Sequence, residues 1–225
     1  MNATYALVPG AGGSAWYWHL LVDELRGRGA EALAVDLPAG DDAAGLPEYA
    51  DAVVTTIGDR APVVLVAQSL GGLSAPLVCE RVDVELLVFL NAMIPVPGES
   101  FGEWWGNTGQ AQARAEAGGK DDDDMYELFF HDVPEPVRKE AIELGEPPQS
   151  NAIATKPAVT TPLPPIPIRV LAGRDDRFFP IAFQRRIAQE RLGITADEMP
   201  GGHLLALSQP KELANRLERY RNELG

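Results

Sequence analysis

The sequence has a single cysteine, Cys79, and only three histidines among its 225 residues. One thiol cannot form an intrachain disulfide, so the fold does not depend on a disulfide framework. Nothing in the cysteine usage indicates an oxidising compartment, and we expect the protein to be cytoplasmic. The shortage of histidine also restricts any imidazole-based chemistry to three positions.

Basic residues are scarce as well, with 19 Lys and Arg against 33 Asp and Glu and a net charge of -14. Such a surface repels phosphate backbones and anionic headgroups, which argues against a nucleic-acid partner. No apolar run approaches the ~20 residues that cross a bilayer, and the first residues lack the basic and long apolar regions of a signal peptide. We therefore expect no membrane partner. The expected oligomeric state is a monomer or a homodimer.

Short, continuously apolar segments alternate with amphipathic ones along most of the chain. The apolar segments predict strands at 5–8, 30–35, 63–67, 84–90, 168–172 and 195–199. Continuous apolar runs suit a parallel sheet that is covered on both faces. Helical patterns at 18–25, 47–57, 70–77 and 213–220 lie between or after them. The sequence predicts one domain over 1–225, an α/β fold with a doubly wound, mostly parallel sheet and ligands bound at its carboxyl edge.

The segment 94–165 interrupts this alternation, because aromatic residues and prolines accumulate there without a clear strand. We interpret it as an inserted helical cap, with helices expected at 110–117 and 137–144. Its acidic run at 121–124 is more simply a solvated turn than a metal site, since four adjacent carboxylates repel one another. No metal site is predicted.

Ser69 is the candidate nucleophile. The predicted strand 63–67 leads into Gln68-Ser69-Leu70-Gly71-Gly72 and then into a helical pattern. This Ala-x-Ser-x-Gly sequence is one methyl group away from the Gly-x-Ser-x-Gly elbow, in which a strained turn lifts the serine above the sheet. A serine that merely caps a helix is the alternative. The preceding strand and the two following glycines favour the nucleophile.

A serine nucleophile requires a base, and His203 is the best candidate among the histidines. His203 follows Pro200-Gly-Gly in a loop between the last predicted strand and the last helix, where it can reach the carboxyl edge. His19 lies beside the apolar stripe of the first helix and is expected to be structural. His131 lies in the predicted cap, where packing or fixing the lid is the expected role.

The acid that orients the base is expected between the serine and the histidine, following the strand 168–172. Asp175 and Asp176 are adjacent there, and the spacing Gly-x-x-Asp-x-x-x-Pro favours Asp176. We expect Asp175 to be exposed or paired with an arginine. Asp176 would hold the imidazole of His203 in the tautomer that accepts the serine proton.

Two backbone amides are expected to stabilise the oxyanion of a tetrahedral intermediate. One is the amide of Leu70, directly after the nucleophile, and the other is the amide of Ala11 in a glycine-rich loop after the first strand. A dinucleotide-binding loop is excluded because the third glycine of its motif is missing. For the substrate pocket we expect Gly10, Trp16, Trp18, Trp104, Trp105 and Phe130, although these aromatics are alternatively part of the cap core.

These motifs together resemble the α/β-hydrolase superfamily. The most similar segments are Val8-Pro-Gly-Ala-Gly-Gly-Ser-Ala-Trp-Tyr-Trp18, Ala67-Gln-Ser-Leu-Gly-Gly72, Asp176-Arg-Phe-Phe-Pro-Ile-Ala-Phe-Gln184 and Gly202-His203. They resemble the branch of small esterases that includes plant methylesterases, salicylate-binding esterases and hydroxynitrile lyases. The resemblance implies acyl transfer through Ser69, without a metal or an organic cofactor.

The chain also departs from that branch. Pro9-Gly10 stands where related enzymes usually carry His-Gly, and Ala67 replaces the first glycine of the elbow. The lyases have threonine at the Gly10 position and lysine after the catalytic histidine, where this chain has Leu204, so lyase chemistry is disfavoured. We expect a serine hydrolase that cleaves small apolar or aromatic carboxylic esters through an acyl-enzyme. The alternatives are a ligand-binding protein with little turnover, or a thioesterase, peptidase or lyase that uses the same site.

Overall fold

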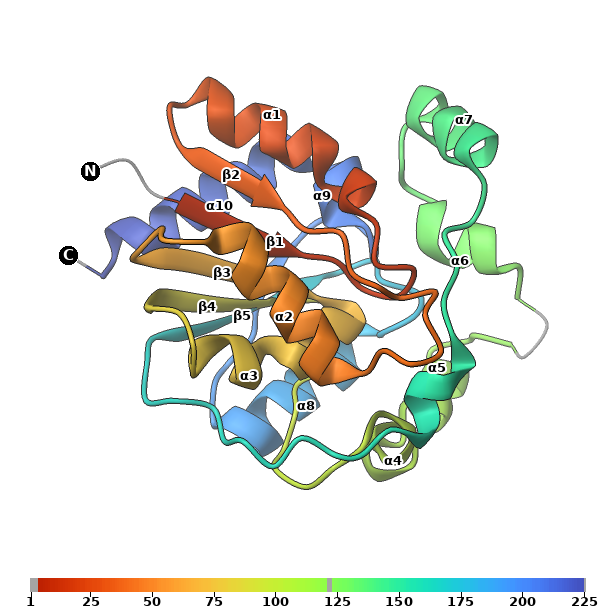
Figure 1. The fold of residues 1–225 in the computed structure, drawn as a ribbon. Helices are drawn as coiled ribbons and strands as arrows, with labels where there is room; N and C mark the ends of the chain where they lie inside the picture. The colour runs from red at the N-terminus through yellow and green to blue at the C-terminus, as the bar shows by residue number, and fades with distance from the viewer. Residues whose placement is uncertain (1–3, 121–122, 225) are drawn as a thin grey trace.

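The computed structural model describes residues 4–120 and 123–224, and its centre is a six-stranded parallel sheet (Figure 1). The strands are β1 (Thr4–Val8), β2 (Glu31–Ala34), β3 (Val63–Gln68), β4 (Val84–Leu90), β5 (Ile168–Gly173) and β6 (Asp197–Met199). Their order across the sheet is β2-β1-β3-β4-β5-β6. The predicted doubly wound parallel sheet is confirmed, with each strand within about two residues of the expected bounds.

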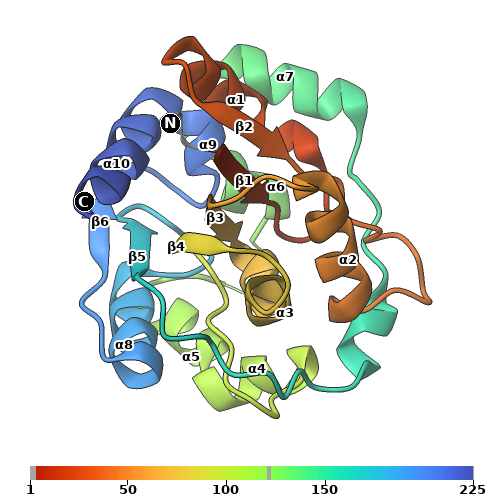
Figure 2. The ribbon, with the colours of Figure 1, turned by 60° about the vertical axis from the view of Figure 1, so that its left-hand side comes forward.

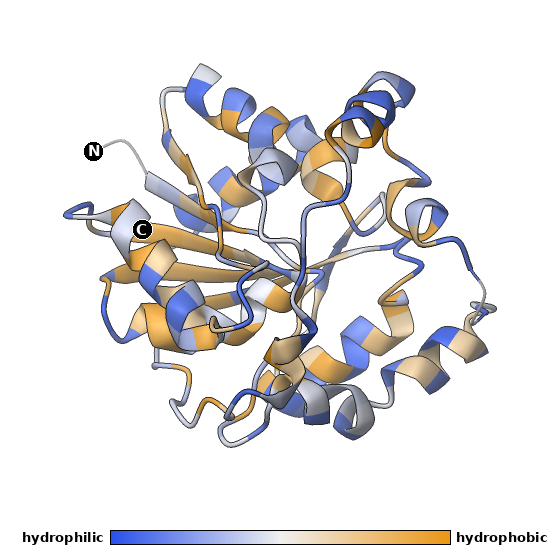
Figure 3. Ribbon diagram, turned by 45° about the vertical axis from the view of Figure 1, so that its right-hand side comes forward, coloured by the Kyte–Doolittle hydropathy of each residue, from blue (hydrophilic) through white to orange (hydrophobic). Residues whose placement is uncertain are grey.

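Helices cover both faces of the sheet because alternate strand residues point to opposite sides. Tyr5 and Leu7 of β1 pack in one buried cluster, and Ala6 and Val8 pack in the other. The first cluster includes residues of α1 (His19–Gly27), α9 (Leu205–Ser208) and α10 (Pro210–Asn222). The second includes residues of α2 (Leu46–Ile57), α3 (Ala75–Cys79) and α8 (Ile181–Leu192). Figures 2 and 3 show these two layers and the mostly apolar strands between them.

Two of the predicted helices begin or continue as tighter 3₁₀ turns. The first pattern divides into η1 (Ala15–Trp18) and α1, and the helix after Ser69 divides into η2 (Ser69–Ser74) and α3. The helix α2 begins as its sequence suggests, with Pro47 in the first turn and the Glu48 carboxylate accepting a hydrogen bond from the Gly45 amide at 2.8 Å. Proline and an acidic residue both favour the first turn of a helix.

The chain between β4 and β5 carries a series of helices. They are α4 (Phe101–Thr108), α5 (Gln110–Glu116), α6 (Met125–Phe130), α7 (Glu135–Leu144) and the 3₁₀ turn η3 (Asn151–Thr155). Figure 1 shows α5, α6 and α7 beyond the carboxyl ends of the strands. The helices expected at 110–117 and 137–144 correspond to α5 and α7, whereas α4 and α6 were not predicted.

The two ends of this helical segment meet at an isolated antiparallel bridge between Glu99 and Val159. The Gly98 amide donates to the Val159 carbonyl at 2.9 Å. Beside the bridge, Arg191 of α8 forms an ion pair with Glu99 at 2.6 Å, and both side chains are almost completely buried. The bridge and the ion pair therefore join the two ends of the segment to each other and to α8.

The acidic run at 121–124 is described only in part, since Asp121 and Asp122 lie outside the described residues. Asp123 accepts hydrogen bonds from Arg114 and from the Lys120 amide, at 2.7 and 2.8 Å. Asp124 caps α6 by accepting from the amides of Tyr126 and Glu127.

Among the helices in the described ranges, none has the length and apolar character needed to span a membrane.

Candidate active site

Ser69 stands at a sharp turn between β3 and η2, with a backbone φ of 50°. This left-handed conformation is uncommon for a residue with a side chain and is characteristic of constrained positions. The following glycines are required by close backbone contacts. A Cβ on Gly71 would lie 2.4 Å from the Pro9 carbonyl oxygen, and one on Gly72 would lie 2.4 Å from that of Met93. The turn is therefore tightly packed on both sides.

His203 and Asp176 form a buried pair at the same edge of the sheet. The Nδ1 atom of His203 lies 2.8 Å from Oδ2 of Asp176, and the two side chains are 2% and 0% exposed. Oδ1 of Asp176 accepts hydrogen bonds from the amides of Phe178 and Phe179, both at 2.8 Å. An ionised carboxylate in this place holds the imidazole proton on Nδ1 and leaves Nε2 as an acceptor.

Three phenylalanines surround the imidazole of His203. The ring centroids of Phe129, Phe178 and Phe179 lie 5.1, 5.5 and 5.3 Å from the imidazole centroid. Phe129 belongs to α6, so one wall of this aromatic enclosure comes from the helical segment and two come from the loop after Asp176. Apolar rings exclude water, and electrostatic interactions such as that of His203 with Asp176 are stronger in a medium of low dielectric constant.

The loop before His203 is held from two directions. The Gly201 amide donates to Oδ2 of Asp175 at 2.9 Å, and the Gly202 amide donates to Oδ2 of Asp132 at 2.6 Å. Asp175 is exposed, which is one of the two situations expected for it. Asp132 follows α6, so the helical segment contacts the histidine loop directly. His131 also lies there, with Nε2 only 2.7 Å from where a Cβ on Gly202 would stand.

The loop that contains Ala11 lies next to Ser69 and is fixed by the helical segment. The Gly12 amide donates to Oε1 of Gln149 at 3.0 Å, and the Gly13 amide donates to the Gly10 carbonyl at 3.1 Å. A Cβ on Gly10 would lie 2.7 Å from the Cβ of Ser69. Gly10 therefore allows the loop to approach the serine closely, and the exposed Ala11 follows it directly.

The residues expected to line a substrate pocket are divided between the site and the core. Trp18 and Trp104 have no exposed surface and belong to the two hydrophobic clusters on either face of the sheet. The prediction is wrong for these two in this conformation, because a fully buried indole offers no surface to a substrate. Trp104 is a core anchor that packs on Phe179 and Phe183.

The other residues expected to line the pocket have different surroundings. Gly10 contacts Ser69, whereas Trp105 is half-buried against Phe178. Phe130 is 9% exposed and stacks on Tyr126 within the helical segment. Trp16 is half-buried, and its indole Nε1 donates a hydrogen bond to the carboxylate of Glu140 in α7 at 2.8 Å. The backbone carbonyl oxygen of Trp16 lies 2.8 Å from Nδ1 of His19. For His19 the alternatives are a structural role and a place in the pocket wall, and this local contact favours the structural role.

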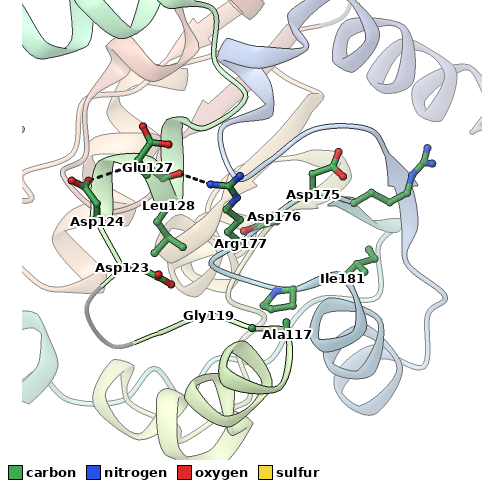
Figure 4. A pocket seen from close by; sticks show the side chains of 13 residues that line it. Ala117, Gly119, Asp123, Asp124, Glu127, Leu128, Asp175, Asp176, Arg177 and Ile181 are labelled. Carbon is green, nitrogen blue, oxygen red and sulfur yellow. Dashed lines mark hydrogen bonds between the residues drawn. The ribbon is translucent and has the colours of Figure 1, made fainter.

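A cavity of about 480 Å³ lies beside the loop that carries Asp176 (Figure 4). Its lining combines the end of α5, the start of α6 and the residues before α8. The acidic side chains of Asp123, Asp124 and Glu127 line one side, and the loop with Arg174, Asp175 and Arg177 lines the other. Ser69 and His203 are not among the lining residues, so this cavity adjoins the acid and not the nucleophile.

The parallel sheet, the serine turn and the buried histidine and aspartate are together typical of the α/β-hydrolase fold. The chain belongs to the alpha/beta hydrolase family, whose model matches residues 6–216. The predicted resemblance to this family is confirmed.

Several relatives in this family are named as esterases. The chain is 36% identical over 110 residues to the probable esterase PIR7A of rice (Oryza sativa subsp. indica), an alignment that covers 44% of this chain and 42% of the relative. It is 31% identical over 105 residues to methyl jasmonate esterase 1 of Vitis vinifera, covering 41% and 40%. The chain thus matches about two fifths of the length of these relatives.

Solved structures share the whole fold at lower identity. Polyneuridine aldehyde esterase superposes with a TM-score of 0.80 at 21% identity, covering 98% of this chain and all of the other. A pyrethroid hydrolase from Sphingobium faniae JZ-2 superposes with a TM-score of 0.74 at 21% identity, covering 99% and 98%. These similarities extend over the helical segment as well as the sheet.

Proposed function

We propose that this protein is a carboxylic ester hydrolase in which Ser69, His203 and Asp176 form a catalytic triad. The observation that carries the proposal is the buried hydrogen bond of 2.8 Å between His203 and Asp176, at the sheet edge where Ser69 occupies its constrained turn. The esterase names of the partly aligned relatives support the same reaction class.

In the proposed reaction, Nε2 of His203 accepts the proton from Oγ of Ser69 as the oxygen attacks the ester carbonyl carbon. Asp176 remains ionised and stabilises the imidazolium that forms. The tetrahedral intermediate collapses to an acyl-enzyme when the alcohol leaves with the proton from His203. A water molecule, deprotonated by the same imidazole, then attacks the acyl carbon. When this second tetrahedral intermediate collapses, the bond to Oγ of Ser69 breaks, the imidazolium returns the proton to Oγ, and the acid is released.

The amides of Ala11 and Leu70 are the proposed donors to the oxyanion. Leu70 lies in the first turn of η2, where helix amides have no partner within the helix. The close approach of Gly10 to Ser69 supports the choice of Ala11, which directly follows Gly10. The proposed substrates are small esters with an apolar or aromatic group, because Trp105, Phe129 and Phe178 give this region an aromatic character.

A fluorophosphonate probe tests the proposal, since it reacts only with an activated serine. We expect the wild-type protein to be labelled at Ser69 and to hydrolyse a short-chain aryl ester. The variants Ser69→Ala and His203→Ala are expected to lose about 10³-fold or more in turnover. A wild-type protein that is neither labelled nor active would instead favour a binding protein on a hydrolase scaffold.

A further inference from the structure

Two carboxamide side chains, Gln68 and Asn91, contact the backbone of the loop that carries His203. Asn91 follows β4 and has no exposed surface, and Gln68 ends β3 with 5% exposed. Nδ2 of Asn91 donates to the carbonyl oxygens of Gly202 and His203, both at 3.0 Å. Nε2 of Gln68 donates to the same His203 carbonyl at 3.1 Å. Both lone pairs of the His203 carbonyl are thus used.

Asn91 also connects this loop to the strand that leads to Asp176. Its Oδ1 atom accepts a hydrogen bond from the Gly173 amide at 2.7 Å. Gly173 ends β5, and a Cβ there would lie 2.5 Å from the carbonyl oxygen of Gly202 and 2.6 Å from that of Gly201. One side chain therefore fixes the spacing between the strand of the acid and the loop of the base.

The chemistry of this junction specifies a carboxamide at position 91. Rotating the group by half a turn would place its oxygen against two carbonyl oxygens, so only the observed orientation is favourable. A carboxylate would face the same two acceptors with a negative charge. The backbone φ of 44° is also one that asparagine adopts more readily than most residues.

We infer that Asn91 and Gln68 are positioning residues for His203, holding its backbone so that the imidazole lies against Asp176 and faces Ser69. This inference rests on the proposed function of the triad. Neither side chain needs to touch the substrate. Their effect is on geometry, and a displacement of about 1 Å at a catalytic group is enough to slow a reaction about 10²-fold.

The first experiment compares kcat and KM of Asn91→Ala and Gln68→Leu with those of the wild type on a short-chain aryl ester. We expect kcat to fall about 10²-fold for Asn91→Ala, with KM nearly unchanged, because the loss is in the chemical step. The kcat of Gln68→Leu should fall less than that of Asn91→Ala, since this variant removes one of the three hydrogen bonds donated to the loop. The matched control is Thr108→Val, which removes a buried hydroxyl bonded to the Trp104 carbonyl at 2.8 Å. That control should keep its kcat.

A second measurement separates positioning from general damage to the fold. In a His203→Ala background the imidazole is absent, so adding Asn91→Ala should leave the residual rate unchanged. A further loss as large as that seen in the wild-type background would overturn the inference, because the residue would then act independently of His203.

The variant Asn91→Asp makes the hydrogen bonding at this junction depend on pH, at pH values where the variant is folded by circular dichroism. A buried carboxyl has a raised pKa, and its protonated form can donate one hydrogen bond to the loop. The ratio of wild-type to variant kcat should therefore decrease as the pH falls. This variant and Gln68→Leu decide the question if Asn91→Ala fails to fold. An active, labelled wild type together with full kcat in these variants refutes the positioning role alone, whereas an inactive, unlabelled wild type refutes the proposed function.

Discussion

Replacing Asp176 with asparagine is the sharpest test of the proposed acid, because the structure dictates what the new amide must do. Oδ1 of Asp176 accepts from the amides of Phe178 and Phe179, both at 2.8 Å. The asparagine oxygen must keep that position, since an NH₂ group there would oppose two donors. The asparagine nitrogen then faces Nδ1 of His203, which becomes an acceptor and leaves the proton on Nε2. That tautomer cannot take a proton from Ser69.

The expected loss follows from this change of tautomer. In serine proteases the equivalent replacement lowers kcat about 10⁴-fold, which is about 5.4 kcal/mol of transition-state stabilisation. We expect a similar fall in kcat for aryl ester hydrolysis by Asp176→Asn, with an unchanged circular dichroism spectrum because the two shapes are nearly identical.

Asp175→Asn is the matched control, one residue away and with the same chemical change. In the wild type the Gly201 amide donates to Oδ2 of Asp175 at 2.9 Å. The side-chain oxygen of the new asparagine can still accept this hydrogen bond, so the kcat of Asp175→Asn should stay close to that of the wild type. A large loss in Asp175→Asn with a small one in Asp176→Asn would move the acid to Asp175. Full activity in both variants would refute the tautomer argument.

Four further outcomes are expected. Gly10→Ala should lower kcat about 10- to 100-fold in steady-state assays, because the new Cβ would stand 2.7 Å from the Cβ of Ser69 and must displace the serine. A variant with the kcat of the wild type would contradict this expectation. Trp104→Ala should reduce the free energy of unfolding by about 3–5 kcal/mol, measured by denaturant titration, because a fully buried indole is removed. Burial raises the pKa of Tyr5 from 10.0 to about 12. The contribution of the neutral Tyr5 side chain to the free energy of unfolding is therefore complete below pH 10 and is lost as the pH rises through 12, which melting temperatures measured across that range would show. Burial also raises the pKa of Cys79 to about 12, so thiol reagents at about pH 8 should react slowly with the folded protein and leave esterase activity intact.

The strands and the order of the candidate triad could be predicted because their signals are local. Continuous apolar runs indicate buried parallel strands, and three histidines leave few choices of base. The helix α8 was missed because its stripe is weak: Gln184 is buried among its apolar residues, and charged side chains follow it directly. The helix α4 had a usable signal, since Ser100 and Glu103 form a capping box that marks its start.

The residues that sequence analysis missed act over long distances along the chain. Asn91 contacts residues 82 and 111 positions away, and no local pattern distinguishes it from any other polar residue after a strand. The error for Trp18 and Trp104 has a related origin. An aromatic residue near a glycine-rich loop, such as Trp18, or in the inserted segment, such as Trp104, has the same local sequence whether it faces a ligand or the core, and only its packing decides.

The bridge between Glu99 and Val159 has a consequence for the helical segment that it closes. Since the two ends of the segment meet at this bridge, the number of residues between them is not constrained by the register of the strands. The bridge thus separates the length of the segment from the pairing of the strands. Its side chains are not independent of the site in the same way, because Asp132 and Gln149 hold the loops of His203 and Ala11. A change of sequence between the two ends therefore leaves the sheet intact and acts on the site through these contacts.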